Sequence, residues 1–458
     1  MSNDIVTTNV SVIAASAPSL LQQTGAIISQ GGTTTDADTS SLLTQASDLT
    51  ALLTAAVSVD SIAYSAGTVT ADVTAGHGYT VGTSMWLTLE GFTPSDYDGD
   101  YLCTFDTTTS FTYALTSDPG TATVMGTYVP LSVTELNQYV TTFFAQGSTT
   151  PVYVLELGAG DPAAGVTALT AWITANPSTD YSYTVPRPWA DESTFVTMAG
   201  NYTSDESKTY FFVTVDADNY DDFADLKSVI SMVESPDVAS TEMSIAAAHY
   251  VALHYNPSST NRVTPYSFSY LYGVTNYPLK GNSSTLATYK AANVNYIDTG
   301  AEGGDSNYIL KWGTTMDGED FNFWYSVDWS QVECSRTISA TIIAGSNSVI
   351  NPLYYNQSGI NRLQDVVANK MKSGQEYGLV YGDVVKTTLT ASALADAIDA
   401  GTYEGKTIVN AVPMASYSSS NPTHYALGRY DGLTVVYAPQ KGFRQIVFNI
   451  QVTDLVAA

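Results

Sequence analysis

The chain has 458 residues, of which 44% are apolar and 13% are charged, so its composition is that of a folded protein of about three domains and not of a disordered tail. Its 16 basic and 44 acidic residues leave a net charge of −28. This charge disfavours binding to nucleic acid and to an anionic membrane, because both would require Lys and Arg to meet phosphate groups.

The charges are unevenly distributed along the chain. The first Lys or Arg is Arg187, and residues 348–458 contain eight basic and eight acidic residues, so the first 347 residues carry the whole net charge. We expect the acidic part to face water and the neutral part to pack against something, which includes other copies of the chain. The alternative is a less solvated domain whose charges balance by chance.

Targeting and membrane signals are not recognisable. The first residues lack the basic start of a secretory or transit signal, and no run of about 18 apolar residues predicts a membrane-spanning helix. Cys103 and Cys334 allow at most one disulfide, which excludes a disulfide framework. A soluble, non-secreted protein is expected.

The N-terminal segment predicts an extended arm. Between residues 5 and 12, Val6, Val10 and Val12 share one face of a strand pattern with polar residues on the other face. Such a strand must find an edge to pair with. After a Ser/Thr/Gly-rich stretch, apolar residues between positions 42 and 53 recur at helical spacing.

Residues 61–128 are typical of a separate β module. They are rich in Thr, Val, Tyr and Gly, contain turn signals and show no helix pattern. Because helix patterns occur on both sides, the module is expected to be an insertion into another domain. Strands are expected near residues 68–74, 84–89, 101–105 and 111–115.

Residues 131–260 alternate strand and helix patterns, which predicts βαβ units with a parallel sheet. Ser132 and Glu135 form a capping-box pattern before one helix, and Asp161-Pro162 opens another. Strands are expected at residues 152–157, 181–185 and 210–215, and further helices from about residue 191, at 220–233 and at 242–254.

The C-terminal segment is expected to be α+β. Residues 359–371 predict an amphipathic helix with Gly374 just past its end. Thr390 caps a second, short helix that is closed by Gly401. Residues 433–437 and 443–452 predict a hairpin around a turn at residues 439–442.

Catalytic, cofactor-binding and metal sites are not predicted. His249 and His254 are five residues apart, which is off the spacing of a helical metal pair, so structural or surface histidines are preferred. Residues 96–100 start like a calcium loop, but Tyr101 stands where that loop needs Gly. A hairpin turn at Asp98-Gly99 explains these residues more simply.

A nucleotide site is also disfavoured. Gly158-Ala-Gly160 follows a strand and precedes a helix, but Ala163 occupies the place of the third glycine, and the surrounding stretch has no lysine for a Walker motif. Abundant carboxylates leave a glycosidase-like pair open, although nothing points to one.

Four segments occur in order along the chain: the opening strand, residues 313–318 followed by Val327-Asp-Trp329, the Asn-Pro turn at residue 351 before an amphipathic helix, and the ending at 442–452. Together they resemble the tail sheath proteins of contractile-tailed bacteriophages. The module at 61–128 is similar to small β modules that recur in phage virion proteins.

The resemblance implies a structural subunit and not an enzyme, without cofactors. Sheath subunits form a helical homopolymer of hexameric rings around a tail tube protein, with baseplate and tail terminator proteins as further partners. The sheath is assembled in an extended, high-energy form in the host bacterial cytoplasm, and in the virion it shortens to drive the tube through the host envelope. Nucleic acid binding and direct membrane insertion are not implied.

The resemblance also implies which residues form subunit interfaces. Terminal arms add as strands to a sheet in the C-terminal domain of neighbouring subunits, whereas the alternative is that both strands complete a sheet in their own chain. A tube contact by Arg362, Lys370 and Lys372 has an ordinary solvated helix face as its alternative. The expected interface residues are Val6, Val10, Val12, Leu433, Val435, Tyr437, Ile446, Phe448, Ile450 and Val452.

The fold class expected is therefore multidomain α/β and α+β. Two other functions stay open: another self-assembling virion or surface-layer protein, and an acidic α/β enzyme. The expected parts are an N-terminal arm (1–20), an α/β core (21–60 and 129–347), an inserted, outward-facing β module (61–128), a C-terminal α+β polymerisation domain (348–443) and an arm strand (444–458).

Overall fold

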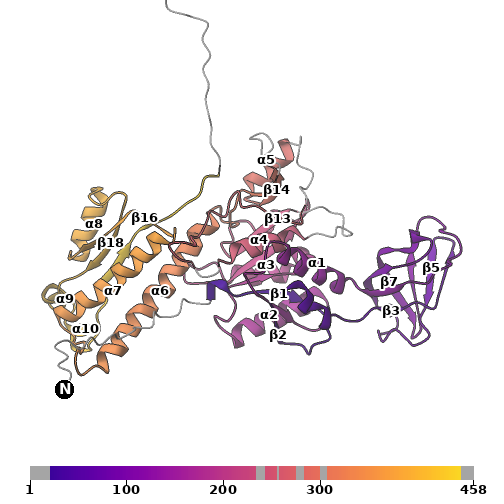
Figure 1. Cartoon of the computed structure of the whole chain (residues 1–458), viewed down its shortest axis with the longest axis horizontal. Helices are drawn as coiled ribbons and strands as arrows, with labels where there is room; N and C mark the ends of the chain where they lie inside the picture. The colour runs from indigo at the N-terminus through magenta and orange to yellow at the C-terminus, as the bar shows by residue number, and fades with distance from the viewer. Residues whose placement is uncertain (1–20, 234–242, 255–256, 275–282, 300–306, 445–458) are drawn as a thin grey trace, which may run out of the picture.

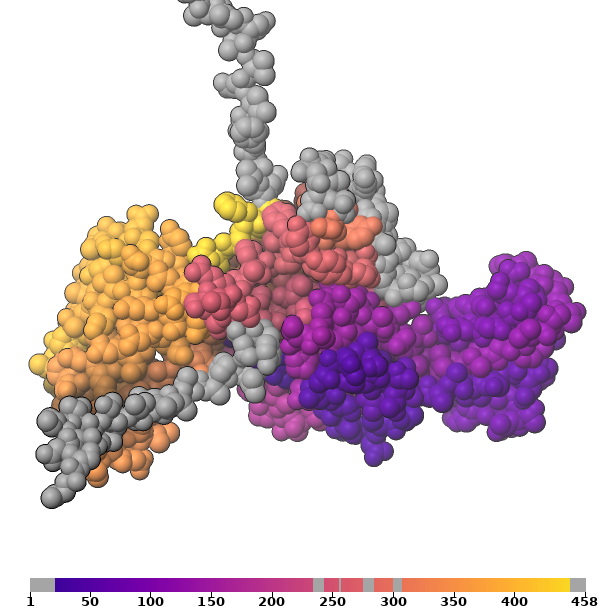
Figure 2. Space-filling model, in the orientation of Figure 1, coloured from indigo at the N-terminus to yellow at the C-terminus, as the bar shows by residue number. Residues whose placement is uncertain are grey.

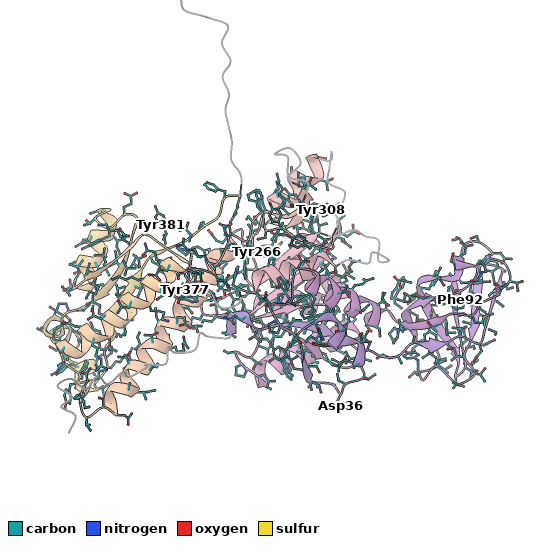
Figure 3. All side chains as sticks on the ribbon, viewed as in Figure 1. Asp36, Phe92, Tyr266, Tyr308, Tyr377 and Tyr381 are labelled. Carbon is teal, nitrogen blue, oxygen red and sulfur yellow. The ribbon has the colours of Figure 1, made fainter. Side chains whose placement is uncertain are left out.

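The structure is a computed structural model that describes residues 21–233, 243–254, 257–274, 283–299 and 307–444. The molecule is elongated, with a β sheet at one end, a layered α/β region in the centre and a helical hairpin with a small sheet at the other end (Figures 1 and 2). Figure 3 marks the two ends by Phe92 and Tyr381, with Tyr266 between them. The helices in these ranges are too short or too polar to cross a membrane.

The first end is a seven-stranded antiparallel sheet with its own hydrophobic core. The four strands expected from the sequence are present. The expected turn at Asp98-Gly99 is wrong in detail, because Gly99 already belongs to a strand and Asp98 closes the preceding loop by accepting the Phe92 N–H. The sheet order is β3 (Val57–Ser58), β9 (Thr127–Pro130), β6 (Ser84–Glu90), β7 (Gly99–Thr107), β8 (Ser110–Ala114), β5 (Thr68–Asp72) and β4 (Ser61–Ser65).

The centre contains a six-stranded sheet in which all neighbours run parallel except the edge strand β2. This confirms the parallel sheet that the alternating pattern predicts, although the pattern did not reveal β1. The order is β13 (Val229–Val233), β12 (Tyr210–Val215), β11 (Ser182–Thr184), β1 (Gly25–Ser29), β10 (Val152–Glu156) and β2 (Thr39–Leu43).

Helices cover both faces of the central sheet. α1 (Leu131–Ala145) and α4 (Ser244–Ala252) bury one apolar face against it, and α2 (Pro162–Ala175) and α3 (Ser193–Gly200) cover the other. Neighbouring residues Ile27 and Ile28 of β1 belong to the two different cores, as the alternation of side chains along a strand requires. The Asp161 carboxylate caps α2 at the Ala164 N–H, as predicted.

Three local predictions in this region are wrong. Residues 220–233 form turns followed by β13 and not a helix, because a fully buried parallel strand shows no alternation. Ser132 and Glu135 do not form a capping box, since α1 begins at Leu131 and the Glu135 carboxylate accepts the Arg187 N–H instead. The helical spacing between residues 42 and 53 corresponds to the end of β2 and a short 3₁₀ helix, Ala46–Ala51.

The centre continues into the second end through a 26-residue helix, α6 (Phe321–Ser346), that the sequence analysis did not identify. It begins beside the hairpin of β14 (Tyr296–Thr299) and β15 (Tyr308–Lys311), which follows α5 (Ser283–Ala291). It then packs along α7 (Gln357–Glu376), where Trp329 lies against Gly374. Gly374 is thus inside the predicted amphipathic helix and not past its end.

The second end also contains a three-stranded sheet of β17 (Asp383–Thr387), β18 (Lys406–Ala411) and β19 (Leu433–Val436). α7 packs against β17 and β18. Helix α8 (Ala391–Asp399) has the predicted Thr390 cap and is followed by Gly401 with a positive φ of 67°. Two short helices, α9 (Met414–Ser420) and α10 (Pro422–Ala426), lead into β19.

The turn predicted at residues 439–442, which was expected to close a hairpin, is wrong. After β19 the chain does not turn back but forms β20 (Ala438–Pro439), which pairs with β16 (Val380–Tyr381). Lys441 and Arg444 then form ion pairs with Glu319 and Asp320 at the start of α6, and these contacts direct the chain away from β19. The expected return strand lies largely outside the described residues.

Candidate assembly surfaces

The crevice beyond the carboxyl ends of the parallel strands, where α/β proteins bind ligands, is filled by the chain itself. Glu156 ends β10 and is 1% exposed. Its carboxylate accepts five hydrogen bonds of 2.7–3.1 Å, from the hydroxyls of Ser29 and Thr33 and from the N–H groups of Gly31, Thr33 and Gly158. An acidic side chain thus occupies the donors that a phosphate would need.

The glycine-rich loop at residues 158–160 takes part in this closure. A Cβ on Gly31 would lie 2.9 Å from the Ala159 Cβ, so the loops after β1 and β10 are in contact. The missing third glycine and the missing lysine already disfavour a dinucleotide site here, and the packing gives a second reason.

A buried carboxylate also joins α6 to the central sheet. Asp328 Oδ2 accepts hydrogen bonds from the hydroxyls of Tyr181 and Tyr210, at 2.9 and 2.8 Å, and its Oδ1 is buried without a partner in the described part of the chain. Burial raises the pKa of Asp328 to about 6, although the hydrogen bonds from the two tyrosines and the charge of Lys227 lower it. Asp328 belongs to the segment that resembles sheath proteins, and here its contacts are internal.

The two central histidines differ in their surroundings. His249 is buried between the hydroxyls of Ser182 and Thr184, both at 2.7 Å, and burial lowers its pKa to about 3, as expected for a structural histidine. His254 has a buried Nε2 without a hydrogen-bond partner among the described residues. The part of the chain that the structure describes contains no cluster of His, Cys, Asp and Glu that could hold a metal ion.

Seven of the expected interface residues, at positions 6, 10, 12, 446, 448, 450 and 452, lie outside the described residues. The other three, Leu433, Val435 and Tyr437, are half-buried and pack against the chain's own core. Leu433 and Val435 pair with β18. In the described chain, β17 and β19 each have a strand partner on one side only, so both outer edges of this sheet are open.

The three expected tube-contact residues are not equally available. Lys370 Nζ lies 3.1 Å from Glu333 of α6, and its side chain is 20% exposed. Arg362 donates to the backbone carbonyl of Asn351. Lys372 is exposed. The helix face is therefore partly engaged within the chain, and a tube contact by these residues remains a prediction.

The free end of the α6–α7 hairpin carries a surface that the sequence analysis missed. Here, large apolar side chains project into solvent, up to 97% exposure for Val349 and 93% for Ile350. The rings of Tyr355 and Tyr425 lie 5.6 Å apart, which joins the hairpin loop to α10. We call this the tip surface, and its residues are Ile342, Ile343, Val349, Ile350, Tyr354, Tyr355, Tyr425 and Leu427.

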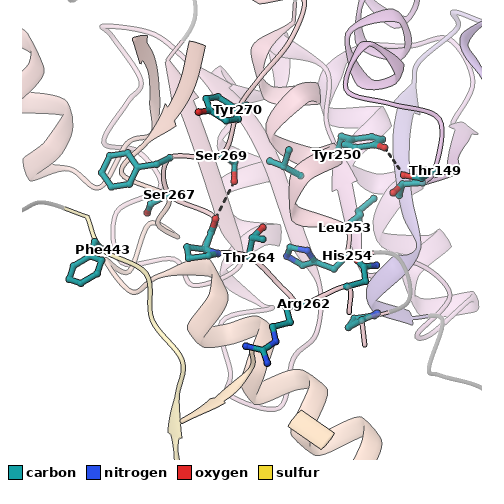
Figure 4. Close-up of a pocket in the computed structure, with 16 residues that line it drawn as sticks. Thr149, Tyr250, Leu253, His254, Arg262, Thr264, Ser267, Ser269, Tyr270 and Phe443 are labelled. Carbon is teal, nitrogen blue, oxygen red and sulfur yellow. Dashed lines mark hydrogen bonds between the residues drawn. The ribbon is translucent and has the colours of Figure 1, made fainter. Parts of the chain in front are cut away.

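At the other end of α6 lies a pocket of about 810 Å³ (Figure 4), which we call the central pocket. Its walls come from the end of α4, from residues 257–270 and from Phe443. Phe268, Tyr270 and Phe443 are exposed large apolar side chains, and Arg262 is also exposed at its wall. His254 Nε2 lies at this pocket as a buried polar atom without a hydrogen-bond partner among the described residues.

No family model and no curated protein matches the chain. Among solved structures, it is similar to the helical sheath of the anti-feeding prophage in the contracted state, with 12% identity, a TM-score of 0.47 and 99% of each chain covered. It is also similar to the baseplate of the anti-feeding prophage in the contracted state, with 9% identity, a TM-score of 0.44 and full coverage of both chains.

These structural neighbours agree with the resemblance to sheath proteins that the sequence analysis identified.

Proposed function

We propose that this chain is a structural subunit of the contractile tail sheath of a bacteriophage and has no enzymatic role. It polymerises around a tail tube in an extended, metastable form, and the polymer shortens to drive the tube through the host envelope. Its partners are further copies of itself, the tube protein, and the baseplate and tail terminator proteins. The particle is assembled in the host cytoplasm, and the subunit is part of the virion.

One observation carries the proposal: the three-stranded sheet of the C-terminal region has unpaired outer edges at β17 and β19 in the described chain. Open edges expose backbone N–H and C=O groups that another strand can satisfy. The chain also supplies two segments with strand patterns, at residues 5–12 and 446–452. Strands exchanged between copies would keep subunits joined while they rotate.

The distribution of charge along the chain also favours the C-terminal region as the site of self-association. The acidic residues that give the chain its charge lie in the first 347 positions, whereas residues 348–458 are neutral. Copies that approach through the neutral part avoid most of the repulsion between their acidic parts. The domain boundaries and interface residues expected from the sequence are part of this proposal.

Electron microscopy of the purified chain tests the proposal. We expect hollow tubes from the intact chain and no tubes from a version that lacks residues 1–15 and 445–458. This truncation retains the ion pairs of Lys441 and Arg444 with Glu319 and Asp320, so the C-terminal region should stay folded. Tubes from the truncated chain, with or without a co-expressed tube protein, would contradict assembly through the arms.

A matched pair of variants separates the strand face from the charge. Ile446→Asp with Ile450→Asp places two carboxylates on the apolar face, and Val447→Asp with Asn449→Asp places two on the opposite face of the same strand pattern. We expect the first variant to lose tubes and the second to retain them. Equal behaviour of the two variants would count against strand pairing.

A further inference from the structure

The tip surface and the central pocket have opposite shapes. At the tip surface, the loop between α6 and α7 presents Val349 and Ile350 with their side chains 97% and 93% in solvent. The central pocket is hollow, and its wall includes the exposed apolar side chains of Phe268, Tyr270 and Phe443. Contiguous exposed apolar surface of this kind is typical of an interaction site.

The two surfaces are also compatible in charge, because neither contains an acidic residue. None of the 16 residues that line the central pocket is Asp or Glu, although the chain contains 44 acidic residues. Residues 347–353 of the tip loop, Asn-Ser-Val-Ile-Asn-Pro-Leu, contain no charged residue. Two copies of an acidic chain can bring these two surfaces together without placing carboxylates against each other.

The polar groups of the two surfaces complement each other as well. The central pocket offers the guanidinium of Arg262 and the buried Nε2 of His254, which has no partner in the described part of the chain. The tip loop offers the side-chain amide of Asn351 and the side-chain oxygen of Asn347, whose Nδ2 donates to the Ile343 carbonyl. A buried polar atom without a partner is costly, so an occupant of the pocket must bring a polar group along with its apolar side chains.

The two surfaces cannot meet within one copy, because α6 separates them. Its Asn322 bonds the pocket wall, accepting from the Tyr266 N–H and donating to the Thr264 carbonyl, and its last residue, Ser346, adjoins the tip loop. At 1.5 Å per residue, the helix places the pocket and the tip about 36 Å apart.

We infer that the tip surface of one copy inserts Val349 and Ile350 into the central pocket of a second copy. A protrusion that fits a pocket elsewhere on the same molecule makes a head-to-tail contact, which generates open helical polymers unless the rotation closes a ring. The inference rests on the proposed function, which requires such a polymer, and it adds a contact that does not use the terminal arms.

Cross-linking between two differently labelled copies tests the contact. One chain carries Ile350→Cys and the other Thr264→Cys, at an exposed position of the pocket wall, and the two are mixed and oxidised. We expect a disulfide-linked dimer that contains both labels. Ser65→Cys, at an exposed position of β4, replaces Ile350→Cys in the control mixture, which also contains the native Cys103 and Cys334.

A charge variant provides a second measurement. Ile350→Asp should lower the association constant about tenfold or more, because a carboxylate would enter an apolar contact. It should not unfold the chain, since the Ile350 side chain is 93% exposed. Leu42→Asp, at a 50% exposed position of the central region, is the matched control and should leave association unchanged.

Each outcome decides between the alternatives. Dimers no more abundant than in the control mixture, or normal association of the Ile350→Asp variant, would overturn the contact. A disulfide within one copy between Thr264→Cys and Phe448→Cys would also overturn it, because the pocket would then hold the chain's own C-terminal segment. Tubes without this cross-link would leave the sheath proposal standing, whereas the cross-link without tubes would support the contact and count against the sheath.

Discussion

The central sheet and the C-terminal region differ in where they place their polar and apolar side chains. The carboxylates of Glu156 and Asp328 in the centre are buried among hydrogen-bond donors. In the C-terminal region, the ion pair of Asp365 and Lys386 has both side chains 52% exposed, while Ile350 lies almost entirely in solvent. The central sheet thus completes its contacts within one chain, and the C-terminal region leaves apolar surface for a partner.

Replacing Glu156 tests whether buried contacts within one chain hold the central sheet together, and this change should have the largest effect. In Glu156→Ala, five hydrogen bonds to a buried carboxylate are lost, and we expect unfolding of the central sheet to become easier by about 3–5 kcal/mol. Hydrogen exchange of the β1 and β10 amides measures this change. The exposed Glu90→Ala is the control, and an equally small change in both variants would show that the carboxylate does not hold the crevice shut.

Asp328 should make the centre sensitive to pH. Its pKa is raised from 3.8 to about 6 by burial, so its stabilising contribution is fully present below the unfolded pKa and is lost as the pH rises through about 6. The loss is about 3 kcal/mol. Asn does not titrate. The free energy of unfolding of Asp328→Asn, minus that of the unmodified chain, should therefore increase by about 3 kcal/mol between about pH 4 and pH 7.5.

Urea unfolding at several pH values measures this difference. The burial of His249 lowers its pKa to about 3 and acts in the opposite direction, but it is present in both proteins and cancels in the comparison. Asp365→Asn, at a 52% exposed side chain, is the matched control, because it makes the same exchange outside the core. A constant difference between Asp328→Asn and the unmodified chain at all pH values would show that Asp328 does not titrate in this range.

The smallest effect is expected for an exposed ion pair of the C-terminal region. Asp365→Ala removes an ion pair whose two side chains are half exposed, and this should change the free energy of unfolding by about 0.5 kcal/mol or less. The same denaturation measurement checks it. A loss of more than about 2 kcal/mol would mean that the C-terminal region depends on its surface charges and not on partners.

The sequence predicted the elements with clear local signals. The β module followed from its alternation and turns, and Asp161 and Thr390 were recognised as caps because they precede regular helix patterns. β13 was mistaken for a helix and β1 was overlooked, since both are short and buried on all sides and so lack alternation.

The candidate surfaces were harder to predict than the elements. Val349 and Ile350 stand in an ordinary Ser/Asn-rich stretch, and only the position of that loop beyond the ends of α6 and α7 shows that they are exposed. The central pocket joins residues near positions 150, 250, 265 and 443, which no local pattern connects. The wrong turn at residues 439–442 has the same origin, because the ion pairs of Lys441 and Arg444 are with residues more than a hundred positions away.

A density map of the assembled tubes would test the central claim most directly, by showing how many strands form the C-terminal sheet. The account predicts that the open edges of β17 and β19 are occupied by strands from other copies, formed by residues around 5–12 and 446–452. Tubes in which this sheet contains only β17, β18 and β19, with both terminal segments packed on their own chain, would contradict it.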